Sequence, residues 1–332
     1  MEFKLPPEVL DIVNGISSMQ IRGASKIAEA GVRALSIVAE NSKSGRPEEV
    51  FEELDYVAQK LLATRPTAVS LPNAVRYVMF EVYKAKENGL KAEDVKARAL
   101  DACREFLRRI REASIKIGEI GARRINDGDT IMTHCHSTAV LNVIKTAHRM
   151  GKNIKVIVTE TRPLYQGFIT AEELEKSGIP FTLIIDSAAR FLMKKVDKVI
   201  VGADAVAANG AVVNKIGTSI IALAAYESRA LVFVAAETYK FSPETLAGEL
   251  VKIEEREPEE VVPAAVFKRW KHGSVRNPSF DVTPPEYIDL IITERGIIPP
   301  QAAFTIIRDE LKDMPYEFQM KYSTYWERSL EV

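Results

Sequence analysis

The 332-residue chain has few cysteines, no excess of charge of either sign and no long apolar run. Its 2 cysteines, Cys103 and Cys135, provide no disulfide framework, which favours a reducing, cytoplasmic setting. The formal net charge is -1, so the composition does not indicate nucleic acid as a partner. No run approaches the roughly 20 apolar residues of a membrane span, and the first residues lack the basic and apolar segments of a signal peptide. We therefore expect neither nucleic-acid nor membrane binding.

Apolar residues recur at the spacing of amphipathic helices through the first part of the chain. The pattern predicts a helix that starts at Pro6-Pro7-Glu8 and further helices at 25–39, 48–63, 73–88 and 92–117. Two basic turns, around Arg22-Gly23 and Arg65-Pro66, lie within this series. After Asn126-Asp127-Gly128-Asp129 the helical spacing of apolar residues gives way to short β-rich runs. We therefore predict a helical domain at 1–124 and a second domain at 125–332.

The second domain alternates short β-rich runs with helical stretches. The runs are 130–134, 154–159, 181–185, 198–201, 231–235 and 290–293. Their spacing is typical of βαβ units with right-handed crossovers, and we predict an α/β fold with a mainly parallel sheet. The runs are nearly all apolar, so we expect the strands to be covered on both faces.

Two short motifs refine this prediction. Thr170-Ala171-Glu172-Glu173 has the pattern of a capping box that opens a crossover helix. Ala208-Asn209-Gly210-Ala211 predicts the turn of a small hairpin after the fourth strand. The charged segment 254–263 is expected to be an exposed connection.

Cys135 lies where the first predicted strand ends and a helix begins. A lone cysteine is often a small buried hydrophobe. At a helix start, however, the unpaired N–H groups and the helix dipole would favour a thiolate or a bound anion. The flanking His134 and His136 suggest zinc, but alternate residues of a strand face opposite sides, and no Cys-x-x-Cys is present. We expect no metal, and the packing and catalytic interpretations of Cys135 stay open.

Asp204 follows the apolar run of the fourth strand. A carboxylate there is a helix cap, a turn residue or a catalytic acid whose pKa burial would raise. The carboxyl-end loops of a parallel sheet meet at one crevice, so Asp204 and Cys135 can converge. Polar clusters at 160–167, 237–240 and 281–285 occupy the same position on other strands.

Several segments have the residues of anion sites. Asn214-Lys215-Ile216-Gly217-Thr218 precedes an alanine-rich helix, and Ser137-Thr138 precedes another. The guanidinium groups of Arg22 and Arg65 match phosphate geometry, although each is equally a solvated turn residue.

Together these motifs resemble the family of sugar-phosphate isomerases related to the regulatory subunits of initiation factor 2B. The matching motifs are Arg22-Gly23-Ala24, Arg65-Pro66-Thr67, Thr133-His134-Cys135, Glu160-Thr161-Arg162-Pro163 with Gln166-Gly167, Gly202-Ala203-Asp204, Asn214-Lys215-Ile216-Gly217-Thr218 and Asn277-Pro278-Ser279-Phe280-Asp281-Val282-Thr283-Pro284-Pro285. The resemblance implies a helical N-terminal domain, a Rossmann-like C-terminal domain and a homo-oligomer, either a dimer or a trimer of dimers.

Three features separate the branches of this family. The regulatory subunits generally lack the Cys and Asp pair, whereas this chain has Cys135 and Asp204. The methylthioribose 1-phosphate isomerases typically have asparagine after the cysteine and a Pro-x-Ser-Thr stretch after the fifth strand. Here His136 follows the cysteine, and the later stretch ends in Lys240. The resemblance therefore implies the branch that converts ribose 1,5-bisphosphate to ribulose 1,5-bisphosphate, with the other two branches as alternatives.

The same resemblance suggests roles for individual residues. Asp204 is expected to be the acid and Cys135 the proton acceptor. Substrate-binding residues are expected at Arg22, Gly23, Ala24, Ser25, Arg65, His136, Ser137, Asn214, Lys215 and Lys240. No metal or redox cofactor is implied, and the absence of Gly-x-Gly-x-x-Gly after a strand argues against NAD. The family also suggests nucleotide monophosphate metabolism, with AMP as a candidate activator.

Overall fold

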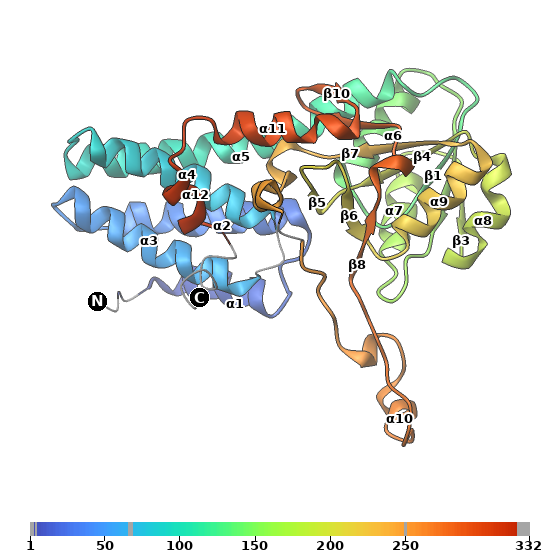
Figure 1. Cartoon of the computed structure of the whole chain (residues 1–332), viewed down its shortest axis with the longest axis horizontal. Helices are drawn as coiled ribbons and strands as arrows, with labels where there is room; N and C mark the ends of the chain where they lie inside the picture. Colours follow the sequence, from blue (N-terminus) through green and yellow to red (C-terminus); the bar gives the residue numbers. More distant parts are fainter. Residues whose placement is uncertain (1–2, 4, 66–68, 249–250, 324–332) are drawn as a thin grey trace. The chain divides into compact units, whose positions relative to one another are not determined.

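The computed structural model describes residues 3, 5–65, 69–248 and 251–323 (Figure 1). Contacts group the chain into two compact units. The first comprises Met1–Glu112, Tyr239–Ala247 and Ile307–Val332, and the second comprises Ala113–Thr238 and Gly248–Ile306.

The first unit is helical, as the apolar spacing predicts. Its helices are α1 (Pro7–Ser17), α2 (Ala24–Asn41), α3 (Pro47–Thr64), α4 (Ser70–Glu87), the first part of α5 (Ala92–Ala122), the end of α11 (Ala303–Leu311) and α12 (Tyr316–Lys321). Their apolar stripes form one core, which also contains Tyr239, Phe318 and Tyr322. A buried ion pair joins Arg76 to Glu244 at 2.8 Å in this unit.

The second unit is built on a sheet that has seven strands within the described residues. The strands are β1 (Thr130–Thr133), β2 (Lys155–Thr159), β3 (Phe181–Ile184), β4 (Lys198–Gly202), β7 (Leu231–Ala235), β9 (Leu290–Thr293) and β10 (Gly296–Ile298). Their order is β10-β9-β7-β4-β1-β2-β3, and all neighbouring pairs are parallel except β9 with β10. The predicted α/β fold with a mainly parallel sheet is confirmed.

Four helices connect these strands. They are α6 (Thr138–Arg149), α7 (Gln166–Glu175), the short α8 (Ala189–Leu192) and α9 (Thr218–Ser228). A second, antiparallel sheet has the order β5-β6-β8, from β5 (Ala205–Val206), β6 (Val212–Lys215) and β8 (Phe280–Thr283). The hairpin of β5 and β6 turns at Ala207–Ala211, as Asn209-Gly210 predicts.

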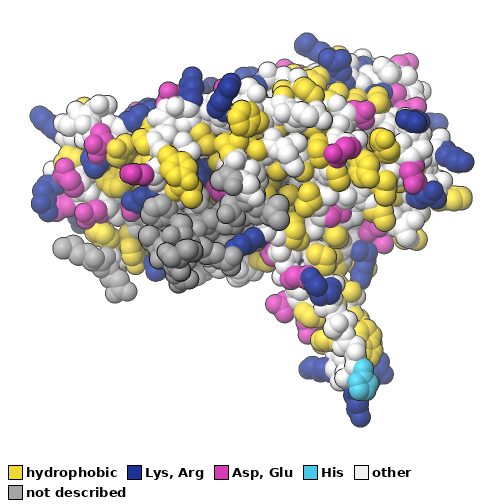
Figure 2. All heavy atoms as spheres, viewed as in Figure 1, with side chains coloured by type: hydrophobic (Ala, Val, Ile, Leu, Met, Phe, Trp, Pro, Cys, Tyr) yellow, Lys and Arg dark blue, Asp and Glu magenta, His cyan; other side chains and the backbone are white. Residues whose placement is uncertain are grey.

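Residues 254–279 form an arm with the short helix α10 (Ala264–Phe267) near its end (Figure 1). Its base is closed by a bridge between Glu255 and Pro278 and by hydrogen bonds such as Ser279 N to Glu254 O at 2.8 Å. Lys and Arg side chains surround the end of the arm (Figure 2). The predicted exposed connection at 254–263 is part of this arm.

Two local predictions are wrong. Thr170-Ala171-Glu172-Glu173 opens no helix, because α7 begins at Gln166 and Thr170 lies inside it. The Thr170 hydroxyl instead donates to the carbonyl of Cys135 at 2.8 Å. The expectation that both faces of the strands are covered fails for β3, where Thr182 and Leu183 are exposed because β3 lies at the edge of the sheet.

The contacts divide the chain at other places than the predicted domain limits. The first unit ends within α5 and regains two later segments. The spacing of apolar residues reflects neighbours along the chain, whereas a compact unit combines segments that are far apart in sequence. Tyr239 and Tyr322, for example, both lie in the first core. The limits 1–124 and 125–332 stay a prediction. No helix in the described part of the chain is long and apolar enough to cross a membrane.

Candidate active site

The strand order of the larger sheet reverses between β1 and β4. From β1 the chain proceeds through β2 to β3 at one edge, and then returns to β4, which pairs with β1 on its other side. In such doubly wound sheets, ligands bind at the carboxyl ends of the strands where the order reverses. Cys135 follows β1 and Asp204 follows β4, so both candidate catalytic residues lie at this switch point.

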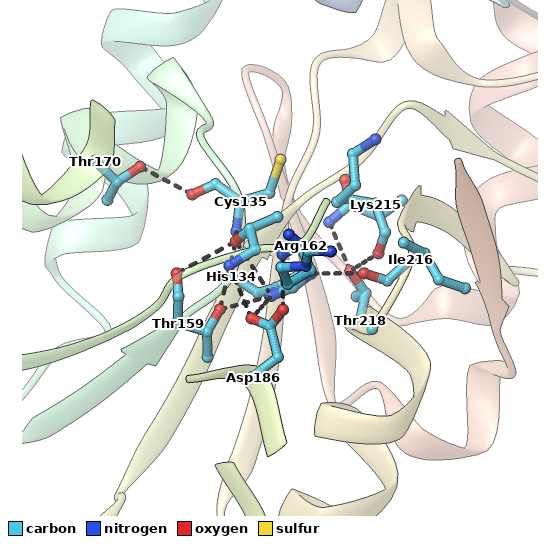
Figure 3. Close-up of polar contacts among 12 residues, drawn as sticks. His134, Cys135, Thr159, Arg162, Thr170, Asp186, Lys215, Ile216 and Thr218 are labelled. Atoms are coloured by element: carbon cyan, nitrogen blue, oxygen red, sulfur yellow. Dashed lines mark hydrogen bonds and ion pairs between the residues drawn. The ribbon is translucent and has the colours of Figure 1, made fainter. Parts of the chain in front are cut away.

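Cys135 has an unusual backbone. Its φ is 68°, in the left-handed region that residues with a side chain rarely occupy. Its N–H donates to Thr161 Oγ1 at 2.8 Å, and its carbonyl accepts from Thr170 Oγ1 at 2.8 Å. Figure 3 shows its thiol pointing away from the polar network that surrounds the backbone, toward the side on which Lys215 extends its amine.

Burial raises the pKa of the Cys135 thiol to about 11. The charge of Lys215 acts in the opposite direction, and the nearby Asp204 carboxylate adds to the increase. The sequence leaves the packing and the catalytic interpretation of Cys135 open, and the position before a helix does not by itself decide the charge of the thiol. The desolvation of the thiol outweighs the favourable charges, so it is protonated at neutral pH.

His134 is buried beside Cys135 and is held on both ring nitrogens. Nε2 lies 2.8 Å from the carbonyl oxygen of Ile216, which can only accept, so Nε2 carries a proton. Nδ1 lies 2.6 Å from Thr159 Oγ1 and then accepts its hydrogen. Burial lowers the pKa of His134, in agreement with this neutral tautomer.

Asp186 organises the loop after β2. Its two carboxylate oxygens accept from the N–H groups of Thr161 at 2.8 Å and of Arg162 at 2.7 Å (Figure 3). Arg162 extends away from this loop, and its guanidinium donates to Tyr165 Oη at 2.6 Å and to Val261 O at 3.0 Å.

Asp204 precedes a strand rather than a helix. Its N–H donates to Val213 O at 2.9 Å, and β5 begins at the next residue. The interpretation of Asp204 as a helix cap is therefore wrong. Its carboxylate is close enough to Cys135 to raise the pKa of the thiol, which places the two side chains in the same part of the unit.

Asn214 and Lys215 lie on β6 and do not open a helix. Helix α9 begins at Thr218, and its N-terminal N–H groups are occupied by a carboxylate of the chain itself. Asp281 accepts from Gly217 N at 2.7 Å and from Ser219 N at 3.1 Å. The anion position predicted at this helix end is therefore filled by Asp281.

Ser137 and His136 follow Cys135 into α6. Ser137 is the N-cap of α6, and its side chain accepts from Val140 N at 3.4 Å. His136 Nδ1 lies 3.2 Å from Thr170 Oγ1. Ser137 thus has a structural role as well as its predicted contact with substrate.

The other predicted binding residues belong to the first unit. Arg22 is exposed, and Gly23, with φ 89°, is the N-cap of α2. Ala24 O accepts from Ser70 Oγ, and Ser25 Oγ accepts from Tyr239 Oη at 2.9 Å. Arg65 ends α3, and Lys240 is buried. Pro66 and Thr67 lie outside the described residues.

Two contributors were not identified from the sequence. Asp186 follows an apolar run with no motif around it, and Thr170 resembles a helix cap. Asp281 belongs to the polar cluster noted at 281–285, but its contact with the start of α9 connects residues distant in sequence. Among the described residues, no three His, Cys, Asp or Glu side chains gather as metal ligands would.

Most of the chain matches a known protein family. The model of the initiation factor 2 subunit family matches residues 20–300. The chain belongs to this family. A Thermococcus kodakarensis protein named ribose 1,5-bisphosphate isomerase is 53% identical over 321 residues, which cover 96% of this chain and 98% of that protein.

Two solved structures from Pyrococcus horikoshii share the fold. One, described as translation initiation factor eIF-2B, has a TM-score of 0.74 and 35% identity, covering 89% of this chain and 98% of that one. The other, 5-methylthioribose 1-phosphate isomerase, has a TM-score of 0.74 and 31% identity, covering 92% and 87%.

Proposed function

We propose that this chain is an isomerase that converts ribose 1,5-bisphosphate to ribulose 1,5-bisphosphate. The observation that carries the proposal is the pair Cys135 and Asp204 at the β1/β4 switch point, in a chain 53% identical to a relative with that name. An anomeric phosphate blocks spontaneous ring opening, so the reaction needs one acid and one base, which such a pair supplies.

The resting protonation state defines the first step of the proposed mechanism. The thiol of Cys135 is protonated at neutral pH, because burial raises its pKa to about 11. Moving that proton to Asp204 breaks the S–H bond, forms an O–H bond and yields the thiolate and carboxylic acid that the reaction needs. Lys215, whose charge lowers the pKa of the thiol, favours this state.

The remaining steps return both groups to that state. Asp204 protonates the ring oxygen, and the bond between C1 and that oxygen breaks. Cys135 removes the proton from C2, and the electron pair forms a C1–C2 double bond. Asp204 then takes the proton of the C2 hydroxyl while Cys135 delivers its proton to C1. The product is the 2-ketose, and no redox cofactor or metal enters the balance.

We propose phosphate-binding roles for the cationic and small residues that the family motifs indicate. Arg22, Gly23, Ala24 and Ser25 lie at the start of α2, where the N–H groups of a helix end favour an anion. In the second unit we include His136 and Ser137, which precede α6, and Asn214 and Lys215 on β6. Arg65 and Lys240 are further candidates. Because Asp281 fills the start of α9, Lys215 rather than that helix end is the expected phosphate contact there.

We also propose a cytoplasmic homo-oligomer, a dimer or a trimer of dimers. Large apolar side chains are exposed on neighbouring elements of the second unit, including Phe191 at 86% on α8 and Ile220 at 68% on α9. Exposed apolar surface of this kind is typical of subunit contacts. Activation by AMP stays a prediction.

A two-substrate assay tests the proposed activity. The chain should convert ribose 1,5-bisphosphate and not methylthioribose 1-phosphate, with product identified by mass spectrometry and NMR. Conversion of the methylthio sugar alone would assign the chain to that branch. Absence of turnover with both sugars, together with a stable complex with initiation factor 2, would assign it to the regulatory branch.

Two variants test the roles of the pair. Cys135→Ser and Asp204→Asn should each lower kcat by about 100- to 10,000-fold, the usual contribution of a positioned acid or base. Cys103→Ala is the matched control, since Cys103 is buried in the first core and its removal should leave kcat unchanged. Near-normal turnover in a folded Cys135→Ser or Asp204→Asn protein would remove that residue from the mechanism.

A further inference from the structure

The backbone of Cys135 is held in a conformation that its own chemistry disfavours. A φ of 68° brings the β-carbon of an L-residue close to its backbone, so such residues persist only where their surroundings fix them. The conformation also determines the direction of the Cα–Cβ bond, and hence where the thiol points. What fixes the backbone therefore aims the sulfur.

Two threonine hydroxyls bind the peptide groups on both sides of the Cys135 α-carbon. Thr161 Oγ1 accepts from the N–H of Cys135, and Thr170 Oγ1 donates to its carbonyl, each at 2.8 Å. The orientations of these two peptide planes are φ and ψ, so the two bonds together define the conformation. Both threonines are buried, at 0% and 2% exposure, so water does not readily replace either bond.

The two hydroxyls come from separate parts of the fold, and each is itself anchored. Thr161 lies in the loop after β2, where its N–H donates to Asp186 at 2.8 Å. Thr170 is fixed by its place inside α7. Neither position depends on Cys135, so the two hydroxyls can impose a conformation rather than follow it.

Thr170 also links Cys135 to His136. A hydroxyl has one hydrogen, and that of Thr170 is donated to the carbonyl of Cys135. The contact of 3.2 Å with His136 Nδ1 therefore requires the proton of that bond to lie on Nδ1. Thr170 thus orients the proposed base and the neighbouring substrate-binding histidine at once.

We propose that Thr161 and Thr170 are positioning residues that clamp the backbone of Cys135 and aim its thiol at the substrate carbon. The inference rests on the proposed function of Cys135 as the base. The valine variants remove each hydroxyl and keep the β-branched shape, which matters for Thr161 because its own φ is 63°. The serine variants keep the hydroxyl and serve as matched rescue.

The first measurement is the split between kcat and KM for ribose 1,5-bisphosphate. Thr161→Val and Thr170→Val should each lower kcat by about 100-fold, the usual cost of misplacing a reacting group by about an ångström. KM should stay within about threefold for Thr161→Val, whereas in Thr170→Val the loss of the contact with His136 should raise KM as well. Thr161→Ser and Thr170→Ser should keep kcat within about threefold of wild type.

The second measurement is independent of isomerase activity. The rate of Cys135 alkylation by iodoacetamide at pH 8 should rise about tenfold in the valine variants, because a half-buried thiol that leaves its fixed position becomes more hydrated, and its pKa returns toward an ordinary value. The Cys135→Ser protein gives the background from Cys103. Thr146→Val, which removes a hydroxyl at the other end of α6, should change neither kcat nor alkylation. Urea unfolding checks that each variant is folded.

The outcomes separate this inference from the proposed function. If wild type fails to turn over the bisphosphate, the proposed function is wrong, and alkylation alone decides on the clamp. If the valine variants keep the alkylation rate of wild type, the clamp is wrong. Serine variants as impaired in kcat as the valine variants, at equal stability, would contradict it as well. If Thr161→Val does not fold, Thr170→Val still tests the hydrogen bond to the carbonyl of Cys135.

Discussion

Desolvation decides the charge of the central thiol. Cys135 lies near a cation and shortly before a helix, both of which favour a thiolate, yet burial raises its pKa to about 11. An enzyme that uses this thiol as a base therefore starts from a protonated group. The thiolate, once formed, is a strong base, and the fraction of protein in the reactive state depends on transfer of the thiol proton to Asp204.

The pH dependence of turnover follows from this pKa. At subsaturating ribose 1,5-bisphosphate, log kcat/KM should stay level between pH 8 and 10 and fall above about 11, where loss of the Cys135 proton leaves none for Asp204 to deliver to the ring oxygen. The measurement is a series of initial rates, with circular dichroism at each pH. A profile that rises steadily between pH 8 and 10 in folded protein would show that the ionised thiol reacts without the shared proton, and would contradict the mechanism.

A second residue couples pH to stability. Burial raises the pKa of Asp281 to about 6, from an ordinary 3.8, even though its carboxylate accepts from Gly217 and Ser219. The folded state thus holds this proton more tightly than the unfolded state. The resulting stabilisation is present below about pH 4 and is lost as the pH rises through about 6.

Asp281→Asn should remove that dependence. Between pH 4 and 6.5, the free energy of unfolding of wild type should fall by on the order of 1 kcal/mol more than that of the variant. Urea unfolding at several pH values measures the free energy of unfolding of both proteins. Subtracting one from the other cancels the contributions of the other carboxylates, which the two proteins share. Parallel curves for the two proteins would contradict the raised pKa.

At the scale of elements, α5 depends on two glycines for its contact with α6. A β-carbon at Gly118 would lie 2.9 Å from Asn142 Cβ, and one at Gly121 would lie 2.6 Å from Val143 Cγ2. Both carbon–carbon distances are shorter than the contacts between packed side chains. The glycines therefore allow the close approach of the helices in the second unit, although glycine is a poor helix former.

Replacing these glycines should destabilise the second unit. Gly118→Ala and Gly121→Ala should each lower the free energy of unfolding by about 1–3 kcal/mol, because the cost of overpacking exceeds the roughly 1 kcal/mol gain in helix propensity. The urea midpoint is the readout. Gly45→Ala, at a position with open space around it, is the control and should be neutral. Stabilisation by Gly121→Ala would mean that the helices do not meet this closely.

For the whole molecule, the exposed apolar side chains of the second unit lead to a prediction about assembly. Apolar surface is visible between the charged side chains in Figure 2. Phe191 and Ile220 are among the most exposed large apolar side chains of the second unit. The double variant Phe191→Asp/Ile220→Asp should shift the mass measured by light scattering toward that of one chain. Tyr316→Asp, an equally exposed site in the first unit, is the matched control. A wild-type monomer would contradict the proposed oligomer.

The sequence alone determined the elements of this protein and their kind. Helical spacing located α1 to α5, apolar runs located β1, β2, β3, β4, β7 and β9, and Asn209-Gly210 located the hairpin of β5 and β6. These succeed because periodicity and turn chemistry act within a few residues. The same local logic placed Cys135 and Asp204 at strand ends, and the motifs around them indicated the family.

The tertiary structure decided what these residues experience. The strand order sets β1 beside β4 and so brings Cys135 and Asp204 to one switch point, while the return of β8 brings Asp281 to the start of α9. Thr170 and Asp186 acquire their contacts only through folding. The protonation of Cys135 does not follow from its position before a helix, because a pKa depends on burial, and burial is created by segments that are distant in sequence.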